Sequence, residues 1–166
     1  MNDELTQIDI DQMKKEIEER RKKIPELREE IRRTREYGDL SENDEYRSAK
    51  REYNKNNSRI RYLESMINTA VIITTDSKED EVGLFDTVKI YYPEDDEEAT
   101  VRIVTTLRND VTTDNISKES PFGKALLGAK VGQTVTVQVN EKFSYPVRVL
   151  EITKGEDDPD LPISSF

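Results

Sequence analysis

Apolar residues recur every seven positions in the first half of the chain. Both predicted helices share this repeat, which falls on Ile10, Ile17, Ile24 and Ile31, then on Tyr46, Tyr53, Ile60 and Ile67. Seven-residue spacing keeps a narrow apolar seam on one side of a helix, which suits pairing with one other helix. The pattern therefore predicts an antiparallel coiled-coil hairpin, with a kink at Pro25 and interruptions of the seam at Arg20 and Asn56.

Two spacings predict where the helices begin. Thr6 followed by Asp9 is typical of a capped helix N-terminus, because each side chain can bond to the backbone N–H of the other residue. Ser41 and Asp44 have the same spacing after the turn.

The pattern changes to a period of two after Ala70. Segments rich in Val, Ile, Thr and Tyr predict strands over 71–75, 87–92, 99–106, 134–139 and 145–152. Ser120 and Pro121 predict the start of a short helix that Gly128 ends. We therefore expect an α+β protein with three parts: a hairpin over 1–75, a β-rich domain over 76–155 and a poorly ordered tail over 156–166.

Composition narrows the possible chemistry. The chain has no cysteine and no histidine, which excludes disulfides, zinc ribbons, thiol nucleophiles and Ser-His-Asp triads. Any metal would have to be held by oxygen, as Mg²⁺, Ca²⁺ and Mn²⁺ are. The net charge is −10, and residues 76–166 hold 19 acidic against 10 basic residues, so phosphate would be repelled from this half. No signal peptide or membrane-length apolar run is found, and the expected location is cytoplasmic.

The turn between the predicted helices, residues 38–45, is rich in carboxylates. Helix capping accounts for Ser41, Asp44 and Glu45, because acidic groups favour a helix N-terminus. It accounts less well for Asp39 and Glu42, which follow Gly38 at the end of the hairpin. Such a pair could complete the ligand shell of a hard cation that another molecule already holds, and alone it would bind Mg²⁺ weakly.

A basic segment follows the acidic turn. Residues 46–62 carry one acidic residue, Glu52, against Arg47, Lys50, Arg51, Lys55, Arg59 and Arg61. Basic helix faces are usually solvated surface. Behind an acidic tip, such a face could instead hold a nucleic-acid backbone while the carboxylates approach a phosphate or its metal.

Two motifs in order resemble the Gre family of bacterial transcript cleavage factors. The first is the tip string Gly-Asp-Leu-Ser-Glu-Asn at 38–43, with Glu-Tyr at 45–46 and Ala-Lys at 49–50. The second is Ser-Pro at 120–121, Gly-Lys-Ala-Leu-Leu-Gly at 123–128 and Val-Gly at 131–132. The resemblance runs from about Leu5 to Ile152.

The resemblance implies a coiled-coil hairpin followed by an FKBP-like domain that docks on RNA polymerase. The hairpin would enter the polymerase secondary channel, where the residues matching the paired tip acids, Asp39 and Glu42, help hold the second Mg²⁺ and position the attacking water. Ser41 would order the tip and touch the shell of the metal, while Arg35 and Lys50 would contact the extruded 3′ end of the nascent RNA. The polymerase would then cleave its own backtracked transcript, so the factor, expected as a monomer, would not itself be an enzyme.

Three alternatives stay open at this level. Asp44 stands where the family usually has Ala, which leaves room for a channel-binding inhibitor of RNA polymerase with the same architecture. An FKBP-like fold also permits a prolyl isomerase, although this half has no Trp and few Phe for an aromatic pocket. A structural coiled-coil adaptor would need none of the tip acids.

Overall fold

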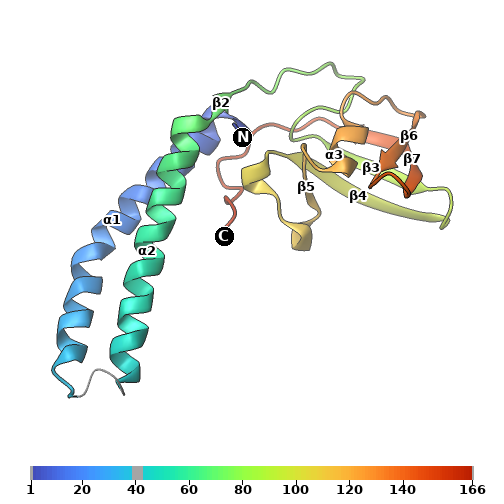
Figure 1. The fold of residues 1–166 in the computed structure, drawn as a ribbon. Coiled ribbons are helices and arrows are strands. Elements are labelled where there is room, and N and C mark those ends of the chain that lie inside the picture. The colour runs from blue at the N-terminus through green and yellow to red at the C-terminus, as the bar shows by residue number, and fades with distance from the viewer. Residues whose placement is uncertain (1, 39–42, 166) are drawn as a thin grey trace. The chain divides into compact units, whose positions relative to one another are not determined.

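The computed structural model describes residues 2–38 and 43–165. Its contacts divide the chain into two compact units, and Figure 1 shows the elements of each. The hairpin unit comprises Ile10–Ala70, and the β-rich unit comprises Asp3–Asp9 together with Val71–Phe166. Residues 3–9, which the sequence pattern assigned to the hairpin, therefore pack with the β-rich unit instead.

Helices α1 (Gln7–Arg35) and α2 (Asp44–Thr69) lie side by side and antiparallel in the hairpin unit (Figure 1). The seam that the seven-residue repeat predicts is buried at Ile10, Met13, Ile17, Ala49, Ile60 and Leu63. Ile24, Leu27 and Ile31 are only half-buried, so apolar packing thins toward the turn. Helix α1 continues through Pro25 as one element.

A polar layer crosses the hairpin where the seam is interrupted. Asn56 is 5% exposed, and its side chain donates to the backbone oxygen of Arg20 (3.0 Å) and accepts from the Arg20 guanidinium (3.3 Å). The Glu16 carboxylate accepts from Arg59 (2.8 Å) on α2 and from Arg20 (2.9 Å) on α1. A buried polar group that is satisfied in one alignment only is a known means of fixing helix register.

A five-stranded sheet forms most of the β-rich unit. Its order is β5-β4-β3-β7-β6, and all pairs are antiparallel except β4 with β5. The strands are β3 (Thr87–Tyr92), β4 (Glu97–Val104), β5 (Asn115–Ser117), β6 (Thr134–Gln138) and β7 (Ser144–Thr153). Two 3-10 helices, η1 (Thr106–Arg108) and η2 (Val111–Thr113), lie between β4 and β5.

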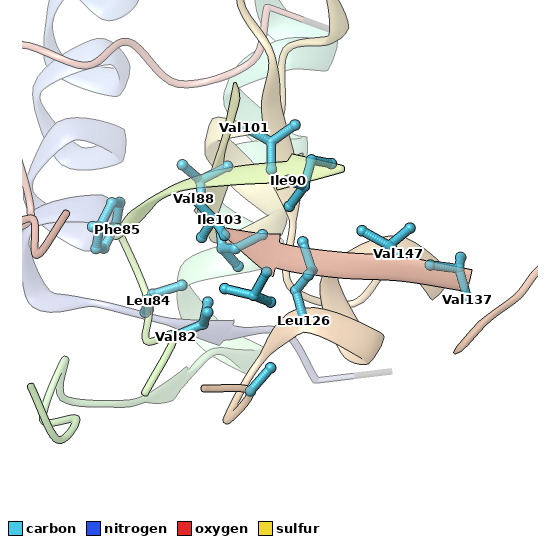
Figure 2. Close-up of a cluster of buried hydrophobic side chains, with 13 residues drawn as sticks. Val82, Leu84, Phe85, Val88, Ile90, Val101, Ile103, Leu126, Val137 and Val147 are labelled. Carbon is cyan, nitrogen blue, oxygen red and sulfur yellow. The ribbon is translucent and has the colours of Figure 1, made fainter. Parts of the chain in front are cut away.

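The core of this unit is aliphatic with one aromatic ring, Phe85, and Figure 2 shows its side chains. Helix α3 (Pro121–Leu126) contributes Leu126 and begins at Ser120, whose hydroxyl accepts from the Gly123 N–H (3.0 Å), as predicted. At Gly123 a Cβ would lie 2.1 Å from the backbone oxygen of Ser117, so the close approach of helix and strand requires glycine there.

The sequence pattern missed strand β1 (Glu4–Leu5) as well as β5, whereas strand β2 (Val71–Ile72) falls at the start of the strand predicted over 71–75. Strands β1 and β2 form a parallel pair that joins residues far apart in the chain. Two-residue strands are too short for a period of two to be visible. Strand β4 begins at Glu97, before the predicted start at residue 99, because Glu97 and Glu98 pair with Tyr92 and Tyr91.

A buried charge cluster closes the β-rich unit around Arg108. The Arg108 guanidinium lies 2.7 Å from Asp9 and 2.7 Å from Asp157, and the side chains of Arg108 and Asp9 are both 0% exposed. The Arg108 guanidinium also donates to the backbone oxygen of Asp158 (3.1 Å). Asp9 also caps α1, accepting from the Thr6 N–H (3.0 Å), while Thr6 accepts from the Asp9 N–H (3.2 Å), as the sequence predicts.

The C-terminal tail, residues 156–165, packs on the β-rich unit. Asp157 accepts a hydrogen bond from Thr6 as well as contacting Arg108, and Leu161 packs against the core. The Ser164 N–H donates to the backbone oxygen of Leu107 (2.6 Å). Partners from the start and the middle of the chain therefore hold this segment.

These observations confirm the α+β class, with an N-terminal helical hairpin and a C-terminal β-rich domain. Within the part of the chain that the structure describes, no helix is both long and apolar enough to span a membrane.

Replacing Arg108 by Met should lower the free energy of unfolding by about 3–5 kcal/mol, because the buried carboxyl groups of Asp9 and Asp157 would lose their cationic partner. Urea unfolding followed by circular dichroism measures this change. Arg32→Met is the matched control, since Arg32 pairs with Glu29 on the exposed surface and should contribute about 1 kcal/mol or less. Equal effects of the two substitutions would contradict the importance of the cluster.

The polar layer makes the stability of the hairpin depend on pH. Burial alone would raise the pKa of the Glu16 carboxyl, but hydrogen bonds and charges from Arg59 and Arg20 outweigh it and hold the pKa below its ordinary value of 4.5. A lowered pKa in the folded state adds stability above the ordinary pKa, and this stability is lost as the pH falls through the lowered value.

Glu16→Gln should therefore destabilise the protein at neutral pH and reduce the fall in stability between about pH 5 and about pH 3. Urea unfolding across this range tests the expectation. Glu18→Gln serves as the control, because Glu18 pairs with Lys22 on the exposed surface only. If the stability of Glu16→Gln fell with pH as the stability of the wild type does, Glu16 would not be a source of this pH dependence.

Candidate functional site

The residues predicted to act at the tip, Asp39, Ser41 and Glu42, lie outside the described residues. The structure describes the chain on both sides of them. Gly38 has φ +120°, a conformation that L side chains rarely adopt, and a Cβ there would meet nothing within 4 Å. Glycine is therefore required at this position for its backbone conformation and not for space.

Asn43 ties the ends of the two helices together. Its side-chain oxygen accepts from the Tyr46 N–H (3.0 Å) and caps α2, while its amide donates to the backbone oxygen of Thr34 (2.6 Å) near the end of α1. The cap of α2 is thus Asn43, two residues later than the spacing of Ser41 and Asp44 suggested. Asn is among the residues preferred at this position, so the signal was present in the sequence.

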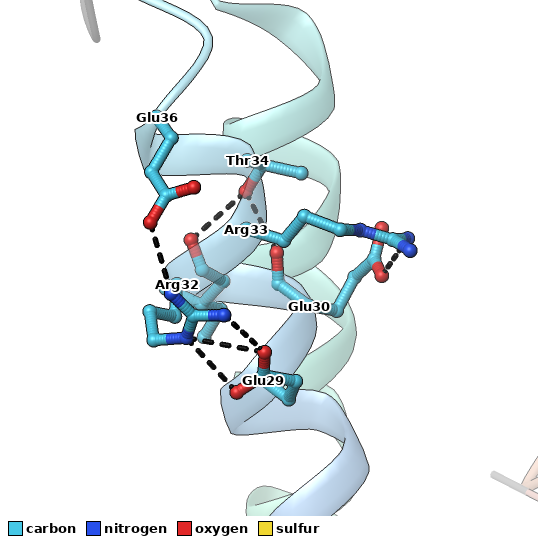
Figure 3. A network of polar contacts seen from close by, with 7 residues as sticks. Glu29, Glu30, Arg32, Arg33, Thr34 and Glu36 are labelled. Atoms are coloured by element: carbon cyan, nitrogen blue, oxygen red, sulfur yellow. Dashed lines mark hydrogen bonds and ion pairs between the residues drawn. The ribbon is translucent and has the colours of Figure 1, made fainter.

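Arg32 and Arg33, near the end of α1, pair with glutamates three or four residues away in the chain (Figure 3). Arg32 pairs with Glu29 and with Glu36 (2.9 Å), and Arg33 pairs with Glu30. The hydrogen bond from Arg32 lowers the pKa of the Glu29 carboxyl. The hydrogen bonds to Glu29 and Glu30 raise the pKa of Arg32 and of Arg33, respectively, above their ordinary range. This part of α1 therefore presents little net positive charge.

On α2, in contrast, three basic residues on one side of the helix have no acidic partner among the described residues. A hollow along one side of this helix, here called the basic stripe, is lined by Tyr46, Arg47, Lys50, Arg51, Asn54, Lys55 and Ser58. Arg47 lies 3.8 Å from Asp44, whereas Lys50, Arg51 and Lys55 make no ion pair with any described residue. Spacings of three to four residues place these side chains on one helix face.

The structure brings both predicted RNA contacts next to one aromatic ring. The guanidinium of Arg35, the last residue of α1, lies 5.8 Å from the centroid of the Tyr46 ring. Lys50 follows Tyr46 by one helical turn in the basic stripe. The sequence places Tyr46 at a seam position and within the family motif, but neither pattern indicates a role in RNA binding.

The other side of the hairpin is acidic. A second hollow is lined by Glu30, Glu45 and Glu52, with Leu27, Ser48 and Ala49. Asp44 at the start of α2 has a side chain that is 94% exposed. Among the described residues, no group of three or more acidic side chains could hold a metal ion. A Mg²⁺ ligand set at this end would need Asp39 and Glu42 and further ligands from another molecule.

Comparisons with known proteins match both units. Residues 4–72 match the family described as “Transcription elongation factor, N-terminal” of GreA/GreB, and residues 76–154 match “Transcription elongation factor, GreA/GreB, C-term”. “Transcription elongation factor GreA” of Leuconostoc mesenteroides is 42% identical over 72% of this chain and 76% of the relative. The same factor of Thermoanaerobacter pseudethanolicus is 44% identical over 74% of this chain and 78% of the relative.

Among solved structures, GreA factor homolog 1 (Gfh1) of Thermus thermophilus is 28% identical, with a TM-score of 0.43. The match covers 93% of this chain and 100% of that one.

Substituting Asn43 tests the link between the helix ends. Asn43→Ala should destabilise the hairpin by more than the ~1 kcal/mol that a lost cap costs, because the bond to the Thr34 oxygen is lost as well. Asn43→Asp keeps an acceptor for the Tyr46 N–H and loses only the donor, so its effect should be smaller. Urea unfolding measures both, and equal destabilisation by Ala and Asp would contradict a separate capping role.

Proposed function

The chain belongs to the GreA/GreB family of transcription elongation factors, and from this we propose that it stimulates cleavage of backtracked RNA by RNA polymerase. The observation that carries the proposal is the presence of the Asp39/Glu42 pair at the turn of a hairpin in a chain of this family. The β-rich unit docks on the polymerase, and the hairpin enters its secondary channel. The protein acts as a monomer and is not itself the nuclease.

Asp39 and Glu42 supply carboxylate ligands to a Mg²⁺ ion that the polymerase holds in part. When bound, such an ion would supply charge stabilisation and activation of the attacking water in a two-metal hydrolysis. Two carboxylates alone bind Mg²⁺ weakly, because the ion keeps most of its water. The factor therefore contributes its ligands only inside the polymerase, and Ser41 orders the segment that carries them.

The length of the hairpin and the alignment of its helices suit its insertion into a channel. Helix α1 has 29 residues, which corresponds to about 44 Å at ~1.5 Å per residue. The polar layer of Glu16, Arg20, Asn56 and Arg59 supports one alignment of the helices, and Asn43 joins their ends. Asn43 thus holds the start of α2, where the basic stripe begins, against the end of α1.

The charges of the hairpin suit a phosphate-bearing strand on one side. Lys50, with Arg51 and Lys55, offers cations that no described glutamate or aspartate neutralises. Arg35 lies at the same end of the hairpin through its contact with Tyr46. We assign Arg35 and Lys50 to contacts with the extruded 3′ end of the nascent RNA, where phosphate contacts would position the strand.

Replacing both tip acids should abolish the stimulation of RNA cleavage and leave binding to RNA polymerase intact. The Asp39→Ala/Glu42→Ala variant should occupy the polymerase as the wild type does and fail to stimulate cleavage, because the added Mg²⁺ ligands are lost. RNA cleavage is measured in a stalled, backtracked elongation complex at matched occupancy. The Glu30→Ala/Glu52→Ala variant is the control, because it removes two carboxylates of the same hairpin away from the turn.

Full stimulation by the tip variant would overturn the assigned roles and favour a structural adaptor. Occupancy without cleavage by wild type or variant would identify an inhibitor of the polymerase. In that case Asp44→Ala is the next substitution, because Asp44 adds an exposed charge beside the tip acids.

A further inference from the structure

Tyr46 stands at the end of the basic stripe that is nearest in sequence to the tip acids. Its ring lines the hollow together with Arg47, Lys50 and Arg51, and the Arg35 guanidinium lies 5.8 Å from its centroid. The residue is half-buried. An aromatic ring that lines a row of cations is the combination with which proteins hold single-stranded nucleic acid, because bases stack on the ring and phosphates meet the cations.

The backbone of Tyr46 is held in place by the helix cap. Its N–H donates to the Asn43 side chain at 3.0 Å, and Asn43 is bonded in turn to the end of α1. Tyr46 lies in the first turn of α2, so its Cα is fixed relative to both helices. A stacking platform benefits from such support, because less freedom is lost when the ligand binds.

Tyr62, also on α2, contacts an arginine as well, but this arginine is already paired with a carboxylate of the hairpin. The Arg59 guanidinium lies 5.3 Å from the centroid of the Tyr62 ring, but Arg59 is bound at 2.8 Å by Glu16 in the polar layer. Its charge is therefore compensated within the hairpin. Arg35 has no carboxylate partner among the residues that the structure describes, and neither have Lys50, Arg51 and Lys55.

We propose that Tyr46, with Arg35 beside it, is a stacking platform for a base of the extruded single-stranded RNA. The proposal rests on the proposed function, since that function brings the RNA 3′ end to this end of the hairpin. Tyr46 acts as a positioning residue: it holds the strand by its base while Lys50 and Arg51 face the phosphates, so the scissile bond stays near the tip acids. Stacking tolerates any base, because every base has a π-face.

The test uses backtracked elongation complexes whose extruded 3′-terminal nucleotide carries either a normal base or an abasic ribose. With wild-type factor, cleavage should be about tenfold faster for the normal base, which corresponds to a typical stacking contribution. Tyr46→Phe should preserve this ratio, whereas Tyr46→Leu should bring it close to one. Tyr62→Leu is the matched control, because it removes the other Arg–Tyr pair of α2 and should leave the ratio unchanged.

Occupancy of the polymerase and thermal unfolding of each variant are measured alongside, so that a folding defect is not taken for lost stacking. A ratio that is equal in wild type and Tyr46→Leu would overturn the proposal while leaving cleavage stimulation intact. A 3′-terminal 4-thiouridine gives an independent result if no variant stimulates cleavage and the proposed function fails. A photocrosslink to the peptide that contains Tyr46 would support the platform, and its absence from an occupied complex would reject it.

Discussion

Asn56 and Glu16 impose one alignment on the two long helices, and the hairpin depends on this constraint. An all-apolar seam would tolerate a slip by one turn at little cost, because aliphatic side chains pack in several alignments. Here a slip would separate Asn56 from the Arg20 backbone and Glu16 from Arg59. Buried polar groups without partners cost on the order of 1–3 kcal/mol each. These hydrogen bonds therefore favour the observed register of α1 against α2.

Most of the fold could be predicted from the sequence, because its large elements repeat a pattern over many residues. The seam at Ile10, Ile17 and Ile60 and the cap at Thr6 follow from local spacing alone. The parallel pair of β1 with β2 could not be found this way, since Glu4 and Val71 meet only through tertiary structure. The same holds for Asp157, whose partners Thr6 and Arg108 lie far away in the chain.

The sequence predicts which residues form the candidate site better than it predicts how their side chains are arranged. The tip motif singles out Asp39, Ser41 and Glu42, which lie outside the described residues, and the run of cations indicates a basic face. The sequence could not show that glutamates neutralise Arg32 and Arg33 while Lys50 and Arg51 stay without ion pairs among the described residues. Such differences depend on side-chain directions around each helix, which charge counts ignore.

The β-rich unit is discontinuous in sequence, because it takes Asp3–Asp9 from before the hairpin and Val71–Phe166 from after it. In topological terms the hairpin is an insertion into this unit, and the β1–β2 pair joins the two chain segments at the insertion point. During synthesis on the ribosome, β1 emerges first and has to wait for β2 until the whole hairpin has been made. Helical hairpins fold through local contacts and form early, whereas a strand pair of such wide separation forms late. The order of synthesis thus makes the hairpin complete before the domain that holds both of its ends.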